Sequence, residues 1–408
     1  MRIESIEIWD GERTLGACDL AWDDDGIDGS ITAVEPVATD AASSRARDRS
    51  APLSLIPGLV DTHVHLIGHA GRGTADFMTW PLTTRPEEQV LHGLAHAQAA
   101  LRGGVTTLRD LSADEIQFSL ARAVRDGVVA AAPRILAHGM VSMTAGHGDL
   151  FTPPAVLTRR PTADGPDECR RLVRTWARAG ADGVKVATSG GVLSSGDKPS
   201  WRNHTPEELA AIVDEAHALS MPVAAHAHTP EGIDTALDAG VDSIEHATLL
   251  TPGQAARIVA AGLTVAPTLL INDRIASGER AVSAEQAQKA QELVVRRDEL
   301  LRGAADAGVD FVLGTDANGH HVAFGDQMAE VRAMARILGW SPERALAAAT
   351  SRAAAAVGLG EKVGRIAPGF AADFVIVRGR PWERLADLDT SRIAAVVSRG
   401  RLVAGSLG

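Results

Sequence analysis

Eight apolar runs of strand length recur along the middle of the chain, and stretches with helical periodicity separate them. The runs span residues 59–65, 105–109, 135–140, 184–187, 223–226, 243–246, 264–267 and 311–315. Helix start signals support the alternation, as in Thr205-Pro206 and Ser341-Pro342, where a hydroxyl residue precedes proline at the first helical turn. Strands that alternate with helices form parallel sheets, so the pattern predicts an α/β fold of the (β/α)8 TIM barrel type.

Both ends of the chain show a different pattern, in which apolar and polar residues alternate between turn signals. This alternation is typical of short antiparallel strands. We therefore expect one small β unit built from both termini, with boundaries at 1–56, 57–362 for the barrel, and 363–408. A polar stretch from Thr39 to Ser50 is expected to be an exposed loop.

Composition limits the classes of partner. The net charge is −12 over 408 residues, which argues against binding to nucleic acid or to an anionic membrane surface. Cys18 and Cys169 are the two cysteines, and no C-x-x-C spacing occurs, so a reducing compartment is expected. The start, MRIESIEIWDG, lacks the apolar core of a signal peptide, and no window has the roughly 18 apolar residues of a membrane span. We expect a cytoplasmic protein; whether it forms a homo-oligomer is left open.

Metal-ligating residue types lie at the ends of the predicted strands. His63 and His65 end the first strand, and residues two apart on a strand point to the same face. Because a barrel places its functional groups at the carboxyl ends of its strands, ligands from distant segments are expected to meet there. The other strand ends contribute Lys185, His226, His246 and Asp316. Imidazole and carboxylate groups together predict a site for divalent metal ions.

Lys185 lies within an apolar strand, where a lysine is rarely buried without a partner. Burial and a nearby cation both favour the neutral amine, which can react with carbon dioxide to give an anionic carbamate. A lysine that binds substrate or forms a salt bridge is the alternative, and spacing alone does not decide between them. Arg109 and Asp110 are expected to form a structural ion pair, and Glu245 is expected to point away from the face that carries His246.

The strand-end segments GLVDTHVHL, GVKVATSGGV, HAHT, SIEHAT and GTDA resemble those of the amidohydrolase superfamily, in the same order. The terminal segments, including GRIAPGFAADFVIV, resemble its small β-sandwich domain, so the resemblance covers nearly the whole chain. It implies two divalent metal ions, zinc in type. His63, His65 and Asp316 would hold the more buried ion, His226 and His246 the second, and carboxylated Lys185 would bridge them.

Two further segments, MTAGHGD and SGGVLSSGDKP, resemble the imidazolonepropionase-like group, which contains Xaa-Pro dipeptidases, carboxypeptidases and amidases that cleave ochratoxin A. The resemblance implies that His147 contacts the scissile carbonyl or a neighbouring carboxylate and that His228 faces the substrate. Several relatives carry tyrosine at the His228 position, whereas this chain contains no tyrosine. From the residues alone, a surface loop histidine stays an alternative for His147, and His228 could replace His226 as the ligand.

The expected function is that of a binuclear metal-dependent hydrolase of amide or peptide bonds. Its substrates would be small and carboxylate-bearing: dipeptides, N-acyl amino acids or ochratoxin-like amides. A hydroxide shared by both metals would attack the carbonyl, with Asp316 as general base and then general acid. Hydrolysis of a cyclic amide, lactone or ester, deamination, and a catalytically silent scaffold are the alternatives. The substrate side chain, the metal identity and the roles of His138, His320 and His321 are left open.

Overall fold

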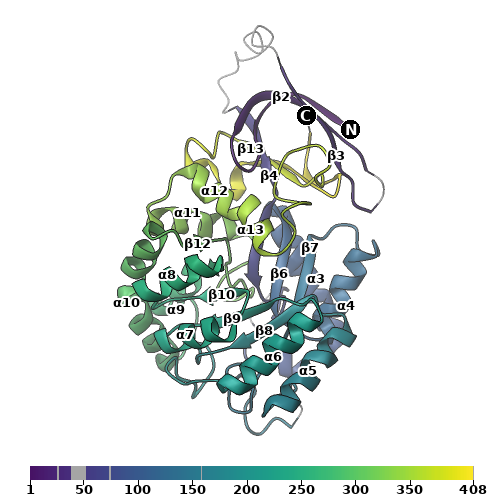
Figure 1. The fold of residues 1–408 in the computed structure, drawn as a ribbon. Helices are drawn as coiled ribbons and strands as arrows, with labels where there is room; N and C mark the ends of the chain where they lie inside the picture. Colours follow the sequence, from purple (N-terminus) through teal and green to yellow (C-terminus); the bar gives the residue numbers. More distant parts are fainter. Residues whose placement is uncertain (25–26, 38–51, 73–74, 158, 408) are drawn as a thin grey trace.

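A parallel eight-stranded sheet forms the centre of the molecule (Figure 1). The computed structural model describes residues 1–24, 27–37, 52–72, 75–157 and 159–407. The sheet strands follow one another in chain order, each paired in parallel with the next. They are β5 (Leu59–Val64), β6 (Val105–Ala113), β7 (Arg134–Met140), β8 (Gly183–Ala187), β9 (Val223–Ala227), β10 (Ser243–His246), β11 (Thr264–Ala266) and β12 (Asp310–Phe311).

Hydrogen bonds beyond the last strand close the sheet. The amide of Thr62 on β5 donates to the carbonyl of Leu313 at 2.9 Å, and the amide of His65 donates to the carbonyl of Ala317 at 2.8 Å. The segment after β12 thus pairs with β5 although only two of its residues form a regular strand. The predicted (β/α)8 barrel is confirmed, and its last strand is shorter than the apolar run suggests.

Helices cover the outside of the sheet, as Figure 1 shows. Several start at the predicted caps: the side chain of Thr205 accepts from the amide of Glu208, and that of Ser341 accepts from the amide of Arg344. The helices are α2 (Trp80–Thr83), α3 (Pro86–Arg102), α4 (Glu115–Arg125), α5 (Pro166–Ala179), α6 (Pro206–Ala218), α7 (Pro230–Ala239), α8 (Pro252–Ala261), α9 (Leu269–Ser277), α10 (Ala284–Asp306), α11 (Gln327–Leu338), α12 (Pro342–Ala349) and α13 (Ser351–Ala356).

The two ends of the chain form a second sheet at one end of the barrel (Figure 1). Its seven strands are hydrogen-bonded in the order β15 (Arg401–Gly405), β14 (Ile393–Ser398), β13 (Phe374–Arg378), β4 (Leu53–Pro57), β1 (Arg2–Trp9), β2 (Thr14–Trp22) and β3 (Ile31–Pro36). β1 and β4 are parallel and the other pairs antiparallel, so the sheet is mixed. The expected terminal β unit is confirmed as one continuous sheet with its own apolar core; the domain boundaries stay a prediction.

The chain passes from the terminal sheet into the barrel at Gly58, between β4 and β5. A β-carbon at this position would lie 2.3 Å from the hydroxyl oxygen of Thr106 on β6, so the close approach requires glycine. Cys18 and Cys169 are free thiols buried in different cores, in agreement with the absence of a disulfide framework.

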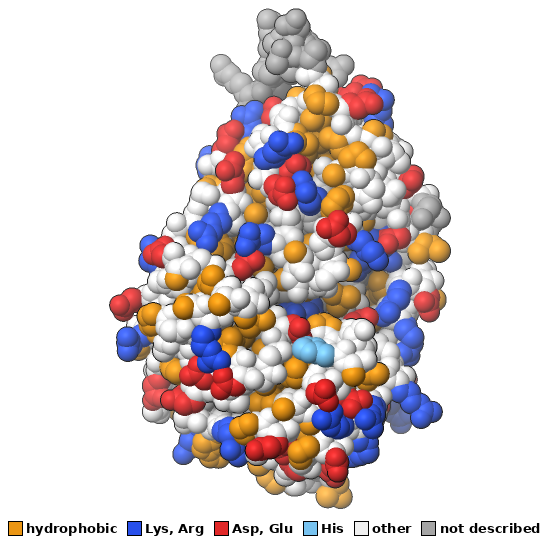
Figure 2. All heavy atoms as spheres, viewed as in Figure 1, with side chains coloured by type: hydrophobic (Ala, Val, Ile, Leu, Met, Phe, Trp, Pro, Cys, Tyr) orange, Lys and Arg blue, Asp and Glu red, His pale blue; other side chains and the backbone are white. Residues whose placement is uncertain are grey.

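On the face shown in Figure 2, acidic and basic side chains are interspersed, and neither charge forms a large continuous patch. No helix in the described ranges combines the length and the apolar character needed to cross a bilayer. The predicted loop from Thr39 to Ser50 lies outside the described residues.

Candidate metal centre

The first cluster of predicted ligands joins the two strands that close the barrel. His63 and His65 lie on or directly after β5, and Asp316 follows β12. The carboxylate oxygen Oδ1 of Asp316 lies 3.0 Å from Nε2 of His65 and 3.8 Å from Nε2 of His63. Ligand atoms of His63, His246 and Asp316 all lie within 4.8 Å of one another, which is the spacing of groups that share a metal ion.

The second cluster comes from neighbouring strands β9 and β10. Ligand atoms of His226, His228 and His246 lie within 4.8 Å of one another, and all three side chains are buried. Nδ1 of His246 lies 2.6 Å from the hydroxyl of Thr268, which orients the ring and leaves Nε2 facing the cluster. His246 is common to both clusters, so the two clusters form one continuous centre.

The choice between His226 and His228 as metal ligand stays a prediction, because the geometry admits both. Nδ1 of His228 lies 2.8 Å from the hydroxyl of Thr248, and its ring stacks on that of His246 at 4.6 Å. The ring of His226 lies 4.6 Å from each of them. Sequence spacing placed both histidines at one strand end, and the fold brings both to the same cluster.

Lys185 on β8 is buried, and its charge acts on the imidazoles of both clusters. Its Nζ has no hydrogen-bond partner within the described part of the chain. Burial lowers the pKa of Lys185 to about 8, with the negative charges of Glu245 and Asp316 opposing this effect. An ammonium group that is buried without an acceptor is unfavourable, so this site favours a neutral or modified amine.

The imidazoles around Lys185 are suited to metal binding because they are neutral. Burial lowers the pKa of His63 to about 4 and that of His228 to about 3, and the positive charge of Lys185 acts in the same direction on both. Metal ligation requires a neutral imidazole, and the groups here need not release a proton to bind. The donor set and the unpartnered lysine therefore fit a centre for divalent cations.

Glu245 was expected to be a structural residue on the opposite face, but it lies inside the barrel and contacts the centre. Its carboxylate lies 2.8 Å from Nδ1 of His63 and accepts a hydrogen bond from Arg109 at 2.8 Å. The expected pair of Arg109 with Asp110 is wrong: Asp110 accepts from the amide of Leu66 instead. Neighbours in a strand point to opposite faces, so Arg109 crosses the barrel interior to reach β10.

Asp61, within the GLVDTHVHL segment, also orients groups at this site, although its residue type and spacing did not predict such a role. Its carboxylate accepts from the hydroxyl of Thr315 at 2.6 Å and from Nε2 of Gln327 at 3.2 Å. These contacts fix the backbone next to Asp316, which adopts a positive φ of 56°. A non-glycine residue in this region is held there by its surroundings, as is typical of functional sites.

His147 lies in the loop after β7 and reaches the centre, as the resemblance implies. Its ring stacks on that of His226 at 4.2 Å with an interplanar angle of 18°. Its amide donates to the side chain of Asn203 at 2.7 Å, and its Nδ1 lies 3.2 Å from the carboxylate of Asp197. His147 is thus packed against the cluster with a side chain that is 16% exposed, and its role toward substrate stays a prediction.

The three histidines with undecided roles occupy two different places. His138 on β7 is buried against Gly183, where a β-carbon would approach its ring to 2.4 Å, and burial lowers the pKa of His138 to about 3. His320 and His321 lie in the loop after Asp316, where the ring of Phe77 stacks on His320 at 5.7 Å. None of these contacts assigns a chemical role.

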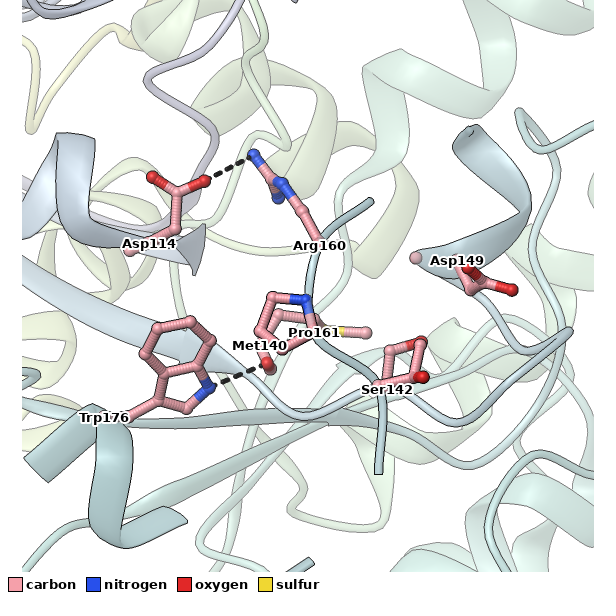
Figure 3. A pocket seen from close by; sticks show the side chains of 10 residues that line it. Asp114, Met140, Ser142, Asp149, Arg160, Pro161 and Trp176 are labelled. Atoms are coloured by element: carbon pink, nitrogen blue, oxygen red, sulfur yellow. Dashed lines mark hydrogen bonds and ion pairs between the residues drawn. The ribbon is translucent and has the colours of Figure 1, made fainter. Parts of the chain in front are cut away.

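A separate pocket lies between the ends of β6 and β7, the segment that follows β7, and helix α5 (Figure 3). Arg160 at its rim pairs with Asp114 at 3.3 Å, and the indole of Trp176 donates to the carbonyl of Met140 at 2.9 Å. The pocket contains none of the predicted metal ligands. The basic side chain here is paired, so the pocket provides no free cation for a substrate carboxylate.

Comparison with known proteins agrees with this geometry. The model of the amidohydrolase family matches residues 54–403. Ochratoxinase of Aspergillus niger is 33% identical over 370 residues, covering 85% of this chain and 74% of the relative. Imidazolonepropionase of Cereibacter sphaeroides is 29% identical over 380 residues, covering 85% and 86%. A crystal structure of a Xaa-Pro dipeptidase with methionine bound in its active site is 28% identical and superimposes with a TM-score of 0.85 over 99% of both chains. This chain belongs to the amidohydrolase family of hydrolases that act on C–N bonds.

Proposed function

We propose that this protein is a binuclear metal-dependent amidase. Its substrates are small molecules in which an amide or peptide bond lies near a carboxylate: dipeptides, N-acyl amino acids or ochratoxin-like amides. The observation that carries the proposal is the pair of ligand clusters sharing His246, with the unpartnered Lys185 buried at the same centre. The names of the relatives, ochratoxinase and Xaa-Pro dipeptidase, support the substrate class.

Six side chains would hold the two ions. His63, His65 and Asp316 would bind one of them, and His226 and His246 the other. Lys185 would bridge both as a carbamate: its neutral amine attacks the carbon of carbon dioxide, a C–N bond forms, and the proton of the amine leaves to solvent. The pKa of Lys185 is lowered to about 8, so near neutral pH a larger fraction of this amine is neutral than in an exposed lysine.

Two divalent cations, zinc in type, would activate a water molecule and polarise the scissile carbonyl. Asp316 would accept the proton released by that water and deliver it to the leaving nitrogen. Its carboxylate is held beside His65 at 3.0 Å, on a backbone fixed by the contacts of Asp61. His147, stacked against His226, would stabilise the negative charge that develops on the carbonyl oxygen, and His228 would face the substrate.

We also propose which class of partner the enzyme binds and in which compartment it lies. Its partner is a small-molecule or dipeptide-like substrate rather than a nucleic acid or a membrane, which the acidic net charge of −12 supports. We place it in the cytoplasm because its two cysteines are buried free thiols, as expected in a reducing compartment.

The test measures metal content and turnover in the same preparations. Plasma mass spectrometry of the purified protein should find two metal ions per chain. Mass spectrometry of products should find hydrolysis within a panel of dipeptides, N-acyl amino acids and ochratoxin A. Asp316→Asn should abolish turnover, whereas Asp182→Asn, which replaces a half-buried aspartate at the opposite end of the barrel, should retain it.

Three results would contradict the proposal. One metal ion per chain with an unmodified Lys185 would exclude the binuclear centre. Release of ammonia, or cleavage confined to cyclic amides, lactones or esters, would assign a different reaction to the same scaffold. Equal and negligible turnover by the wild type and Asp316→Asn across the panel would mean that these substrates are wrong and that the scaffold is silent toward them.

A further inference from the structure

The segment SGGVLSSGDKP, residues 189–199, forms a loop after β8 that encloses His147. Asp197 in this loop is 1% exposed, and its carboxylate makes the contact between the loop and the His147 ring. Its Oδ2 lies 3.2 Å from Nδ1 of His147 and accepts hydrogen bonds from the hydroxyl of Ser194 at 2.6 Å and from the amide of Gly191 at 2.8 Å. A buried carboxylate with three partners has one orientation, so the loop presents a fixed acceptor to the histidine.

We propose that Asp197 is a positioning residue for His147. It holds the imidazole flat against His226 at the metal centre, with Nδ1 occupied by the carboxylate and Nε2 left for the substrate. This inference rests on the proposed function, because it assigns the purpose of the contact to the reaction at that centre. Asp197 itself acts through His147 and touches no reacting atom.

The shape of the loop supports a positioning role. Two of the three glycines in the segment allow close approach to His147 and Asp197. A β-carbon on Gly191 would lie 2.2 Å from Cε1 of His147, and one on Gly190 would lie 2.2 Å from Oδ1 of Asp197. The imidazole is therefore confined between the backbone of Gly191 on one side and the ring of His226 on the other. Any larger side chain at Gly191 must displace the imidazole.

Helix α10 anchors the loop from outside. Nζ of the buried Lys289 donates to the carbonyl oxygens of Ser194 at 2.8 Å and of Asp197 at 3.1 Å. One turn earlier, the carboxylate of Glu285 accepts from the amide of Gly196 at 3.1 Å. Because the buried ammonium of Lys289 donates to carbonyl oxygens of the loop, it holds the loop in one defined conformation. A loop that positions His147 requires such a conformation.

The experiment is a double-mutant cycle on the metal-loaded enzyme with an N-acyl amino acid or dipeptide substrate. Asp197→Asn should lower kcat/KM by about 10- to 100-fold, mostly through kcat, since the affected interaction acts on developing charge. In a His147→Ala background, the same substitution should change kcat/KM by less than about twofold. Asp182→Asn, a carboxylate-to-amide change away from the loop, serves as the matched control.

Equal losses in both backgrounds, or a wild-type kcat in Asp197→Asn, would overturn the inference. If Asp197→Asn does not fold, Gly191→Ala replaces it, with the same expected loss of kcat and the same dependence on His147. Crystal structures provide a readout that does not need turnover: the His147 ring should leave His226 in Asp197→Asn. A wild type without amidase activity would refute the proposed function, whereas an unmoved ring in this variant would refute the positioning role alone.

Discussion

Replacing Glu245 by glutamine should weaken both the metal centre and the fold. The carboxylate of Glu245 is fully buried and accepts from Arg109 at 2.8 Å and from the hydroxyl of Ser243 at 2.7 Å, while its second oxygen lies 2.8 Å from Nδ1 of His63. Burial alone would raise the pKa of Glu245, but the charge of Arg109 and the hydrogen bond of His63 lower it below its ordinary value. Glutamine has the same shape without the charge.

Two costs follow from these contacts. The substitution removes the anionic partner of the buried Arg109, and breaking a buried ion pair from one side costs about 3–5 kcal/mol of folding free energy. The new amide group also turns a donor toward Nδ1 of His63, which favours the tautomer with hydrogen on Nε2, the nitrogen that faces Asp316. Loss of such an outer partner lowers metal affinity by about 10- to 100-fold.

Chelator competition would measure the metal affinity, and urea unfolding of the metal-free protein would measure the stability. The control is Glu330→Gln, which changes another fully buried glutamate. The carboxylate of Glu330 accepts hydrogen bonds from the amides of Leu269 and Leu270 rather than contacting a predicted ligand, so this control should keep the wild-type metal affinity. If Glu245→Gln bound two metal ions with wild-type affinity and unfolded at the same urea concentration, the role assigned to Glu245 would be refuted.

Three further predictions follow from single contacts. If Lys185 bridges the two ions as proposed, replacing it by methionine should lower the metal content below two ions per chain and lower kcat/KM by more than about 100-fold, because a bridging ligand is lost rather than an outer partner. Plasma mass spectrometry and kinetics check this, and two retained ions would contradict it. The folded-state pKa of Glu330, about 8, exceeds the ordinary 4.5, so the wild type should lose stability relative to Glu330→Gln as the pH rises between these values. Urea unfolding at about pH 5 and about pH 8 checks the sign, and a pH-independent difference would refute it. Gly58→Ala should destabilise the protein by about 1–3 kcal/mol, since the β-carbon would meet the stiff side chain of Thr106; an unchanged urea midpoint would contradict this.

The barrel and its terminal β unit were predictable from local residue patterns. Apolar runs and helix caps are local properties, so the alternation from residue 59 onward and caps such as Thr205 and Ser341 predicted elements that the structure contains. The strand-end histidines were predictable for the same reason, because every strand of a parallel barrel ends at one face. This rule alone predicts that His63 and His65 lie near Asp316, as they do in the structure.

The pairing of buried charges depends on how distant segments pack in the folded chain. Arg109 is adjacent to Asp110 in the sequence but pairs with Glu245, because adjacent strand residues point to opposite faces and the interior face brings β6 and β10 together. The contact of Asp197 with His147 joins two loops that are fifty residues apart. Such pairings depend on how strands and loops pack across the barrel, and no local pattern of residues records them.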